Sequence, residues 1–101
     1  MIDATSILFE RLELGGEAVA NLVIWRVPSP LRGSRHSYKY RLALVVDGVC
    51  VLRYDNEAGK GDHKHVGDTE LPYEFTDIER LRRDFLVEAR AWLTGHPRDA
   101  R

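Results

Sequence analysis

Cysteine is nearly absent from this chain of 101 residues, which contains Cys50 alone. A single cysteine excludes an internal disulfide and any cysteine-rich zinc site. No apolar run approaches the roughly 18 residues that a membrane-spanning helix needs, and no basic segment followed by an apolar one opens the chain. We therefore expect a cytoplasmic protein with no membrane partner. Cys50 lies among aliphatic residues and is predicted to be a small buried thiol.

Net charge is also nearly absent, at −1, but the charges are unevenly distributed. Between residues 26 and 64 the sequence has eight basic and four acidic side chains, so the remainder of the chain is acidic. A locally positive region can attract a polyanion even when the whole molecule is close to neutral. A randomly mixed surface remains an equally good interpretation of this pattern.

The composition is that of an ordinary globular protein, with 44% hydrophobic and 31% charged residues. A chain of this length builds one core, so we expect a single domain over residues 1–101 with a short flexible tail from about residue 95. The predicted fold class is α+β: an antiparallel β-sheet of about five or six strands with one C-terminal amphipathic helix packed on it.

Turn residues divide the apolar segments into strands. Gly15-Gly16 separates the β-prone segments 6–14 and 17–27, and Asp47-Gly48 between 37–46 and 49–55 is a strong signal for a type I′ hairpin. Residues 63–66 form a possible further strand before a turn at Gly67-Asp68.

An uninterrupted ladder from the Asp47-Gly48 turn would pair Val46 with Val49 and Leu44 with Val51. Continued to the open end, the same register pairs Leu42 with Arg53 and Tyr40 with Asp55. The other face then carries Arg41 and Lys39 beside Tyr54 and Asn56, so polar side chains gather at the open end. A slip of one residue would change these faces.

The C-terminal helix is predicted from an apolar stripe at spacings of three and four, formed by Ile78, Leu81, Phe85, Ala89 and Trp92. Thr76 as N-cap and Glu79 three residues later form a capping box, and Gly95 and Pro97 end the helix.

Residues 54–65 form the most polar stretch, with two histidines, two lysines, three carboxylates and no aliphatic side chain other than Ala58. If His63 and His65 lie in a strand, alternation places both imidazoles on one face and Lys64 on the other. Imidazoles titrate near neutral pH and therefore suit general acid–base catalysis. RNA cleavage without a metal needs such a base and acid, together with cations for the phosphate.

The sequence therefore gives two sets of candidate site residues. The candidate catalytic residues are His63, His65, Lys60, Asp55, Asp62 and Tyr54. The candidate substrate-binding residues are Arg41, Arg53, Lys39, Asn56 and Lys64. No cofactor and no metal ligand are assigned.

Two other interpretations of the same stretch remain open. His63, His65 and either Asp55 or Asp62 offer three nitrogen and oxygen ligands, as a catalytic zinc or manganese site would. Alternatively, residues 56–62 are a hairpin loop and the two histidines are a chance feature of the surface. Gly59-Lys60-Gly61 lacks the spacing and the following Ser or Thr of a phosphate-binding Walker loop.

Three segments, residues 38–42, 49–56 and 59–65, resemble the TumE-like family, small toxin components of bacterial and archaeal toxin–antitoxin loci. The similarity continues through residues 72–75 into the helix and covers most of residues 20–93. The resemblance implies a cognate antitoxin as partner, typically encoded next to the toxin and carrying a helix-turn-helix DNA-binding domain. An apolar edge strand such as residues 22–27 is a candidate surface for that partner.

Three hypotheses follow for the activity. The first is a ribonuclease toxin that cleaves RNA by general acid–base chemistry around His63 and His65. The second is a non-catalytic growth inhibitor or regulatory protein that binds its target through the same polar surface. The third is a metal-dependent nuclease or nucleotide-modifying enzyme.

Overall fold

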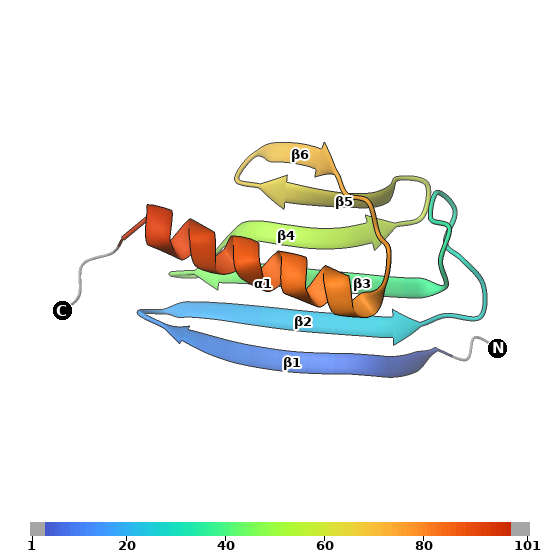
Figure 1. The fold of residues 1–101 in the computed structure, drawn as a ribbon, viewed down its shortest axis with the longest axis horizontal. Coiled ribbons are helices and arrows are strands. Elements are labelled where there is room, and N and C mark those ends of the chain that lie inside the picture. The colour runs from blue at the N-terminus through green and yellow to red at the C-terminus, as the bar shows by residue number, and fades with distance from the viewer. Residues whose placement is uncertain (1–3, 98–101) are drawn as a thin grey trace.

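The computed structural model describes residues 4–97, which form a six-stranded antiparallel sheet and one helix. The strands lie side by side in chain order, so β1 and β6 form the two edges (Figure 1). The predicted α+β fold is confirmed, whereas most of the predicted tail, residues 98–101, lies outside the described residues. The elements are β1 (Thr5–Gly15), β2 (Ala18–Arg26), β3 (Tyr38–Val46), β4 (Val49–Glu57), β5 (Gly61–Val66), β6 (Thr69–Pro72) and α1 (Ile78–Gly95).

Helix α1 crosses one face of the sheet in front of β2, β3 and β4 (Figure 1). The predicted apolar stripe supplies its buried side, and Leu81, Phe85 and Ala89 have no exposed surface. They join alternate side chains of the strands, such as Leu22 and Leu42, in one hydrophobic cluster. Among the described residues no second layer covers the opposite face, which we call the open face (Figure 1). Within the same residues, no helix has the length and apolar content needed to cross a membrane.

The helix begins one residue later than the capping box predicts. Asp77, not Thr76, is the N-cap, and its carboxylate accepts a hydrogen bond from the backbone N–H of Arg80 at 2.8 Å. An aspartate also interacts favourably with the positive end of the helix dipole, which a threonine hydroxyl cannot do. The predicted end is confirmed, because α1 stops at Gly95.

The Asp47-Gly48 turn is confirmed, and both residues have the positive φ that a type I′ turn requires, at 51° and 79°. The first hairpin differs from prediction by one residue: Gly15 is the last residue of β1, and Gly16-Glu17 forms the turn. Glu17 takes a positive φ of 66° there. The turn at Gly67-Asp68 lies where the sequence places it, between β5 and β6.

The register of β3 against β4 is not the uninterrupted one. Val46 pairs with Val49 as predicted, but a β-bulge follows, so Leu44 pairs with Leu52 and not with Val51. Arg41 consequently pairs with Asp55, and Arg53 lies opposite Ala43.

Burial explains why the bulged register is preferred. The uninterrupted ladder would place Arg53 and Asp55 on the face of Leu42, under the helix, where burying two charges is costly. A bulge adds one residue to one strand and exchanges the faces beyond it. Leu52 and Tyr54 are then buried at 1% and 2% exposure, and the charged pair moves to the open face.

Two further expectations are corrected. Residues 22–27 do not form an edge, because β2 is bonded to β1 on one side and to β3 on the other. Cys50 is exposed rather than buried. It pairs with Val45 beside the turn, just before the bulge, and alternation places it on the open face.

Two loops meet at the end of the sheet where β5 begins. The backbone N–H of Gly59 donates to the carbonyl of Arg32 at 2.7 Å, which ties the β4–β5 loop to the β2–β3 loop. Gly33 and Gly61 touch backbone to backbone, so closely that a Cβ on Gly61 would lie 2.7 Å from the Gly33 carbonyl oxygen. This contact fixes the start of β5, and with it the positions of the histidines that follow.

Candidate functional site

The alternation of β4 and β5 separates two groups of polar side chains. His63 and His65 lie on one face, as predicted, with their ring centroids 4.9 Å apart. Lys64 lies on the other face, where its Nζ is 3.1 Å from Glu88 of α1. Arg53 and Asp55 of β4 are the register partners of the histidines. We call Arg53, Asp55, His63 and His65 the open-face cluster.

The cluster is built from two adjacent rows that run across the strands. In one row Arg41, Asp55 and His63 follow each other on β3, β4 and β5. In the next row Arg53 on β4 and His65 on β5 are followed by Glu70 on β6. Side chains that face each other across neighbouring strands lie about 5 Å apart at Cβ, so residues distant in sequence come into contact here.

Asp55 is the centre of the cluster. Its Oδ1 lies 2.8 Å from Nε2 of His63, and its Oδ2 lies 3.0 Å from Nε of Arg53. His63 is almost completely buried, at 3% exposure, whereas His65 is partly accessible. Of the two imidazoles, His65 is therefore the more accessible, although its Nε2 is itself buried.

The hydrogen bond of His63 assigns its tautomer. Nδ1 lies 3.1 Å from the carbonyl oxygen of Gly61, which can only accept, so Nδ1 carries a hydrogen. In a neutral ring Nε2 then presents a lone pair toward Asp55. Although Nε2 and Oδ1 are in contact, the angles do not form a hydrogen bond, and both atoms are buried without a hydrogen-bond partner among the described residues.

Glu70 is a site residue that the sequence interpretation missed. Its Oε1 lies 3.9 Å from Nε2 of His65 and 3.7 Å from Nζ of Lys60. Through this contact Lys60, a candidate catalytic residue in the β4–β5 loop, reaches the margin of the open-face cluster. The Gly67-Asp68 turn could have revealed Glu70, because a two-residue turn pairs Val66 with Thr69 and therefore His65 with Glu70.

Lys39 and Arg41, two predicted substrate-binding residues, are exposed on β3. Both alternate away from the buried Tyr40 and therefore lie on the open face. Arg41 is the direct neighbour of Asp55 in the ladder. These two cations continue the cluster toward the middle of the sheet.

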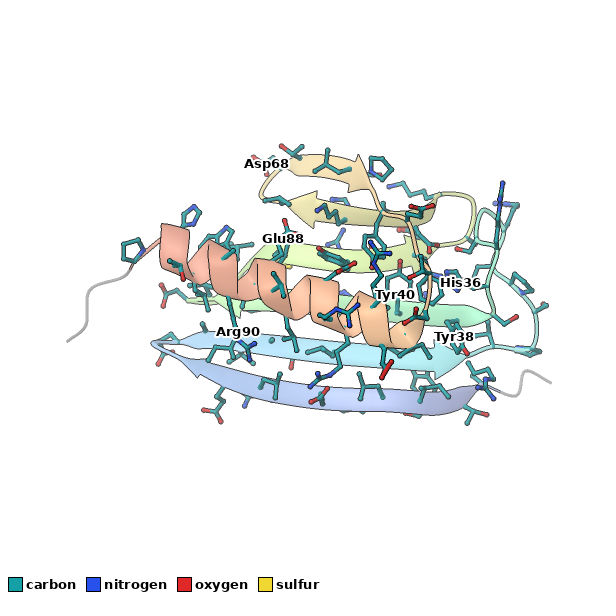
Figure 2. All side chains as sticks on the ribbon, in the orientation of Figure 1. His36, Tyr38, Tyr40, Asp68, Glu88 and Arg90 are labelled. Carbon is teal, nitrogen blue, oxygen red and sulfur yellow. The ribbon has the colours of Figure 1, made fainter. Side chains whose placement is uncertain are left out.

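Four candidate site residues lie on the helix side instead. Tyr54 and Lys64 both hydrogen-bond to Glu88, which projects from α1 toward β4 (Figure 2). Burial, reinforced by the hydrogen bond to Glu88, raises the pKa of Tyr54 well above its ordinary value. This tyrosine keeps its proton and cannot act as a base near neutral pH.

Asn56 is a structural residue in the core. It is 2% exposed, its Oδ1 accepts from the backbone N–H of Tyr40 at 2.9 Å, and its Nδ2 donates to the Tyr38 carbonyl at 2.7 Å. These bonds complete the β3–β4 ladder beyond Arg41 and Asp55, where the backbone pairing ends.

Asp62 holds the β2–β3 loop. Its Oδ1 accepts from the Ser34 hydroxyl at 2.5 Å, and its Oδ2 lies 2.7 Å from Nε2 of His36. The other nitrogen of His36 accepts a hydrogen bond from the backbone N–H of Tyr38, so both ring nitrogens of this histidine have partners. Figure 2 shows His36, Tyr38 and Tyr40 grouped beside the first turn of α1, and His36 also stacks on Phe75 at 3.9 Å between ring centroids. A cavity of about 440 Å³ lies beside this loop. His36 lines it but has a structural role, because both of its ring nitrogens are already hydrogen-bonded.

Removing the Tyr54 hydroxyl tests the separation of the two faces. Tyr54→Phe is expected to cost about 1 kcal/mol of unfolding free energy, because a partly buried hydrogen bond to Glu88 is lost. It should leave the activity of an equal amount of protein unchanged, because the hydroxyl lies on the helix side. Urea denaturation measures the stability, and an activity assay in cells measures the second effect. A loss of activity at unchanged stability would show that the Tyr54 hydroxyl takes part in the site.

The arrangement joins two imidazoles, a carboxylate and several cations on an uncovered face of the sheet. Residues 2–93 match the family model described as Toxin TumE. No curated protein and no solved structure matches the chain. The match extends over nearly the whole chain and includes every residue of the open-face cluster, and so the chain belongs to the TumE toxin family, the toxin components of toxin–antitoxin systems.

Proposed function

We propose that this toxin is a ribonuclease, and that it cleaves the RNA backbone on the open face of the sheet. The observation that carries the proposal is the open-face cluster itself. Two imidazoles with ring centroids 4.9 Å apart lie beside a carboxylate, and Arg41 is next to them in the ladder. These groups can supply proton transfer and phosphate binding, which are the two requirements of phosphodiester cleavage.

Exposure divides the roles within the cluster. His65 is the accessible imidazole and exchanges protons with the reacting oxygen atoms as general acid or base. His63 is buried against Asp55 and acts as a positioning residue. Arg53 holds the second carboxylate oxygen of Asp55 in place.

The residues on β1, β2 and β3 fit a single-stranded nucleic acid. Phe9 is 74% exposed, and Trp25 is 37% exposed opposite Lys39 in the ladder. Alternation puts both aromatic side chains on the open face, next to the exposed cations Lys39 and Arg41. Aromatic rings on which bases stack, next to cations that follow the phosphates, are the usual components of such a surface. RNA lying across these strands would lead into the open-face cluster.

Membership of the toxin family implies a cognate antitoxin. We propose that this antitoxin carries a helix-turn-helix DNA-binding domain and that the toxin acts in the cytoplasm, where its RNA substrate is found. The exposed outer edge of β1 with Phe9 is a better surface for the antitoxin than residues 22–27, which are already paired on both sides.

The test is induced expression in a bacterial host of the wild type, His63→Ala/His65→Ala and His65→Ala, followed by growth and total RNA integrity. His96→Ala is the matched control, because it removes an exposed imidazole at the end of α1. Growth arrest with RNA fragmentation is expected from the wild type and the control, and neither effect from the two cluster variants at equal protein abundance. Fragmentation by the double variant would refute the proposal.

The competing candidate is a non-catalytic inhibitor that binds its target through the same face. The large exposed surface of Phe9 favours it, because such side chains are typical of protein-binding sites. In that case the wild type and the double variant would both arrest growth while RNA stays intact. Charge reversal at Arg41 and Lys60 would then weaken target binding without changing any RNA product.

A further inference from the structure

We infer that the open-face cluster binds one divalent transition-metal ion through Oδ1 of Asp55, Nε2 of His63 and Nε2 of His65. This inference deepens the proposed function and rests on the same site, but the binding of the ion is measurable without any RNA. The three side chains come from β4 and β5 and converge on the open face.

The spacing of the three atoms supports chelation. One ligand atom from each of the three residues lies within 4.8 Å of the other two, and Oδ1 of Asp55 is 2.8 Å from Nε2 of His63. Two metal–ligand bonds of about 2.1 Å hold their ligand atoms roughly 3.4 Å apart in a tetrahedral site. Small side-chain rotations, without a change in the strands, therefore bring the atoms to coordination distance.

The hydrogen bonding of these atoms is a second, independent observation. All three are buried and have no hydrogen-bond partner among the described residues. A buried polar atom without a hydrogen-bond partner is destabilising, and here three such atoms lie in one place. Binding to a cation satisfies all three atoms at once, because a metal takes lone pairs and needs no hydrogen.

The surrounding contacts are those of oriented metal ligands. Nδ1 of His63 donates to the Gly61 carbonyl, which leaves the lone pair of Nε2 for the ion. Nε of Arg53 lies 3.0 Å from the other oxygen of Asp55, which leaves Oδ1 as the free donor of that carboxylate. By contrast, the side chains of His36 and Asp62 on the helix side hydrogen-bond to each other and to the β2–β3 loop, so they have no free ligand atom.

The ligand types select the class of metal. Two imidazole nitrogens and one carboxylate oxygen suit Zn²⁺, Mn²⁺ and their transition-metal neighbours, whereas Mg²⁺ and Ca²⁺ prefer oxygen ligands alone. Three protein ligands also leave coordination positions for a water molecule and a phosphate oxygen. In the metal-loaded protein the proton-transfer role assigned to His65 passes to bound water, whose pKa the ion lowers.

The experiment is calorimetric titration of the chelator-treated, full-length toxin with Zn²⁺ or Mn²⁺, together with the absorption spectrum of Co²⁺ as a geometric probe. One equivalent is expected to bind, with a rise in melting temperature, and an equal concentration of Mg²⁺ should not displace it. Asp55→Asn and His65→Ala should each weaken binding by about 100-fold, since the first replaces a charged carboxylate oxygen by a neutral amide oxygen and the second removes a ligand outright. His96→Ala should bind as the wild type does.

Three results would overturn the inference: no binding to the folded wild type, equal binding by Asp55→Asn, or loss of binding in His96→Ala. Asp55→Asn keeps the size of the side chain, so it covers the case in which His65→Ala fails to fold. RNA cleavage measured in parallel separates the two proposals. RNA cleavage by a protein that binds no metal would support the proposed ribonuclease function and overturn the metal-binding inference. Metal binding without RNA cleavage would support the metal-binding inference and overturn the ribonuclease proposal.

Discussion

Phe85→Ala is expected to lower the free energy of unfolding by about 3–5 kcal/mol, the range for removing a large aromatic side chain from a core. Phe85 has no exposed surface and lies at the centre of the packing between α1 and the sheet. Its ring meets the ring of Tyr54 edge-on, with centroids 5.5 Å apart. The substitution thus loses buried apolar area, leaves a cavity and breaks an aromatic contact of β4.

A domain of this size has a total stability of roughly 5–15 kcal/mol, so this one change removes a large part of it. Urea denaturation followed by circular dichroism measures the loss. Val87→Ala is the matched control on the same helix: Val87 is 62% exposed, and its truncation should stay within about 0.5 kcal/mol of the wild type. A cost below 1 kcal/mol for Phe85→Ala would mean that α1 is not held on the sheet by this contact.

Gly61→Ala is expected to cost about 3 kcal/mol or more, and the chain contains its own control. Gly61 and Gly48 have nearly the same positive φ, at 76° and 79°. A Cβ on Gly48 would meet nothing within 4 Å, whereas one on Gly61 would lie 2.7 Å from the carbonyl oxygen of Gly33. Gly48→Ala should therefore show only the cost of the left-handed conformation, about 1–2 kcal/mol.

The difference between the two variants measures the contact of the two loops. Because that contact is backbone against backbone, neither side can move away without shifting a loop. Gly61 also provides the carbonyl that orients His63, so under the proposed ribonuclease function Gly61→Ala should reduce RNA cleavage per folded molecule, which Gly48→Ala should not. Equal destabilisation by both variants would show that the loops tolerate the extra methyl group.

The fold was largely predictable because its turns and its helix depend on local sequence. Asp47-Gly48 tolerates positive φ, and the apolar stripe of α1 repeats every three or four residues, so both signals lie within a few residues. The N-cap was missed because Thr76 and Asp77 are both good capping residues, and the capping-box pattern takes no account of the charge that favours Asp77 at the positive end of the helix dipole.

The site was predictable only in part, because it depends on the register of neighbouring strands. Alternation alone placed His63 and His65 together, since both belong to one short strand. Arg53 and Asp55 could not be assigned to that face, because the bulge before Leu52 responds to burial across the whole sheet. The sequence analysis placed Asp62 beside Asp55 among the catalytic candidates and Asn56 among the substrate-binding ones, although the neighbours of Asn56 and Asp62 in the fold make both structural.

The bulge has a consequence for the mutational tolerance of the toxin. Along β4 beyond the bulge, each residue that supports the core is followed by one that faces the open side, and β5 continues the alternation. A saturation scan that records protein abundance and toxicity separately should thus show two interleaved periodic patterns, with Leu52 and Tyr54 in one and Arg53 and Asp55 in the other. Deleting a paired residue of β4, such as Arg53, would put the two patterns out of phase, so that the core and the site would compete for the same face. Deleting Val51, the extra residue of the bulge, would leave Leu52 opposite Leu44 and keep both patterns in phase. Deletions at paired positions of β4 should therefore be far more harmful than the deletion of Val51.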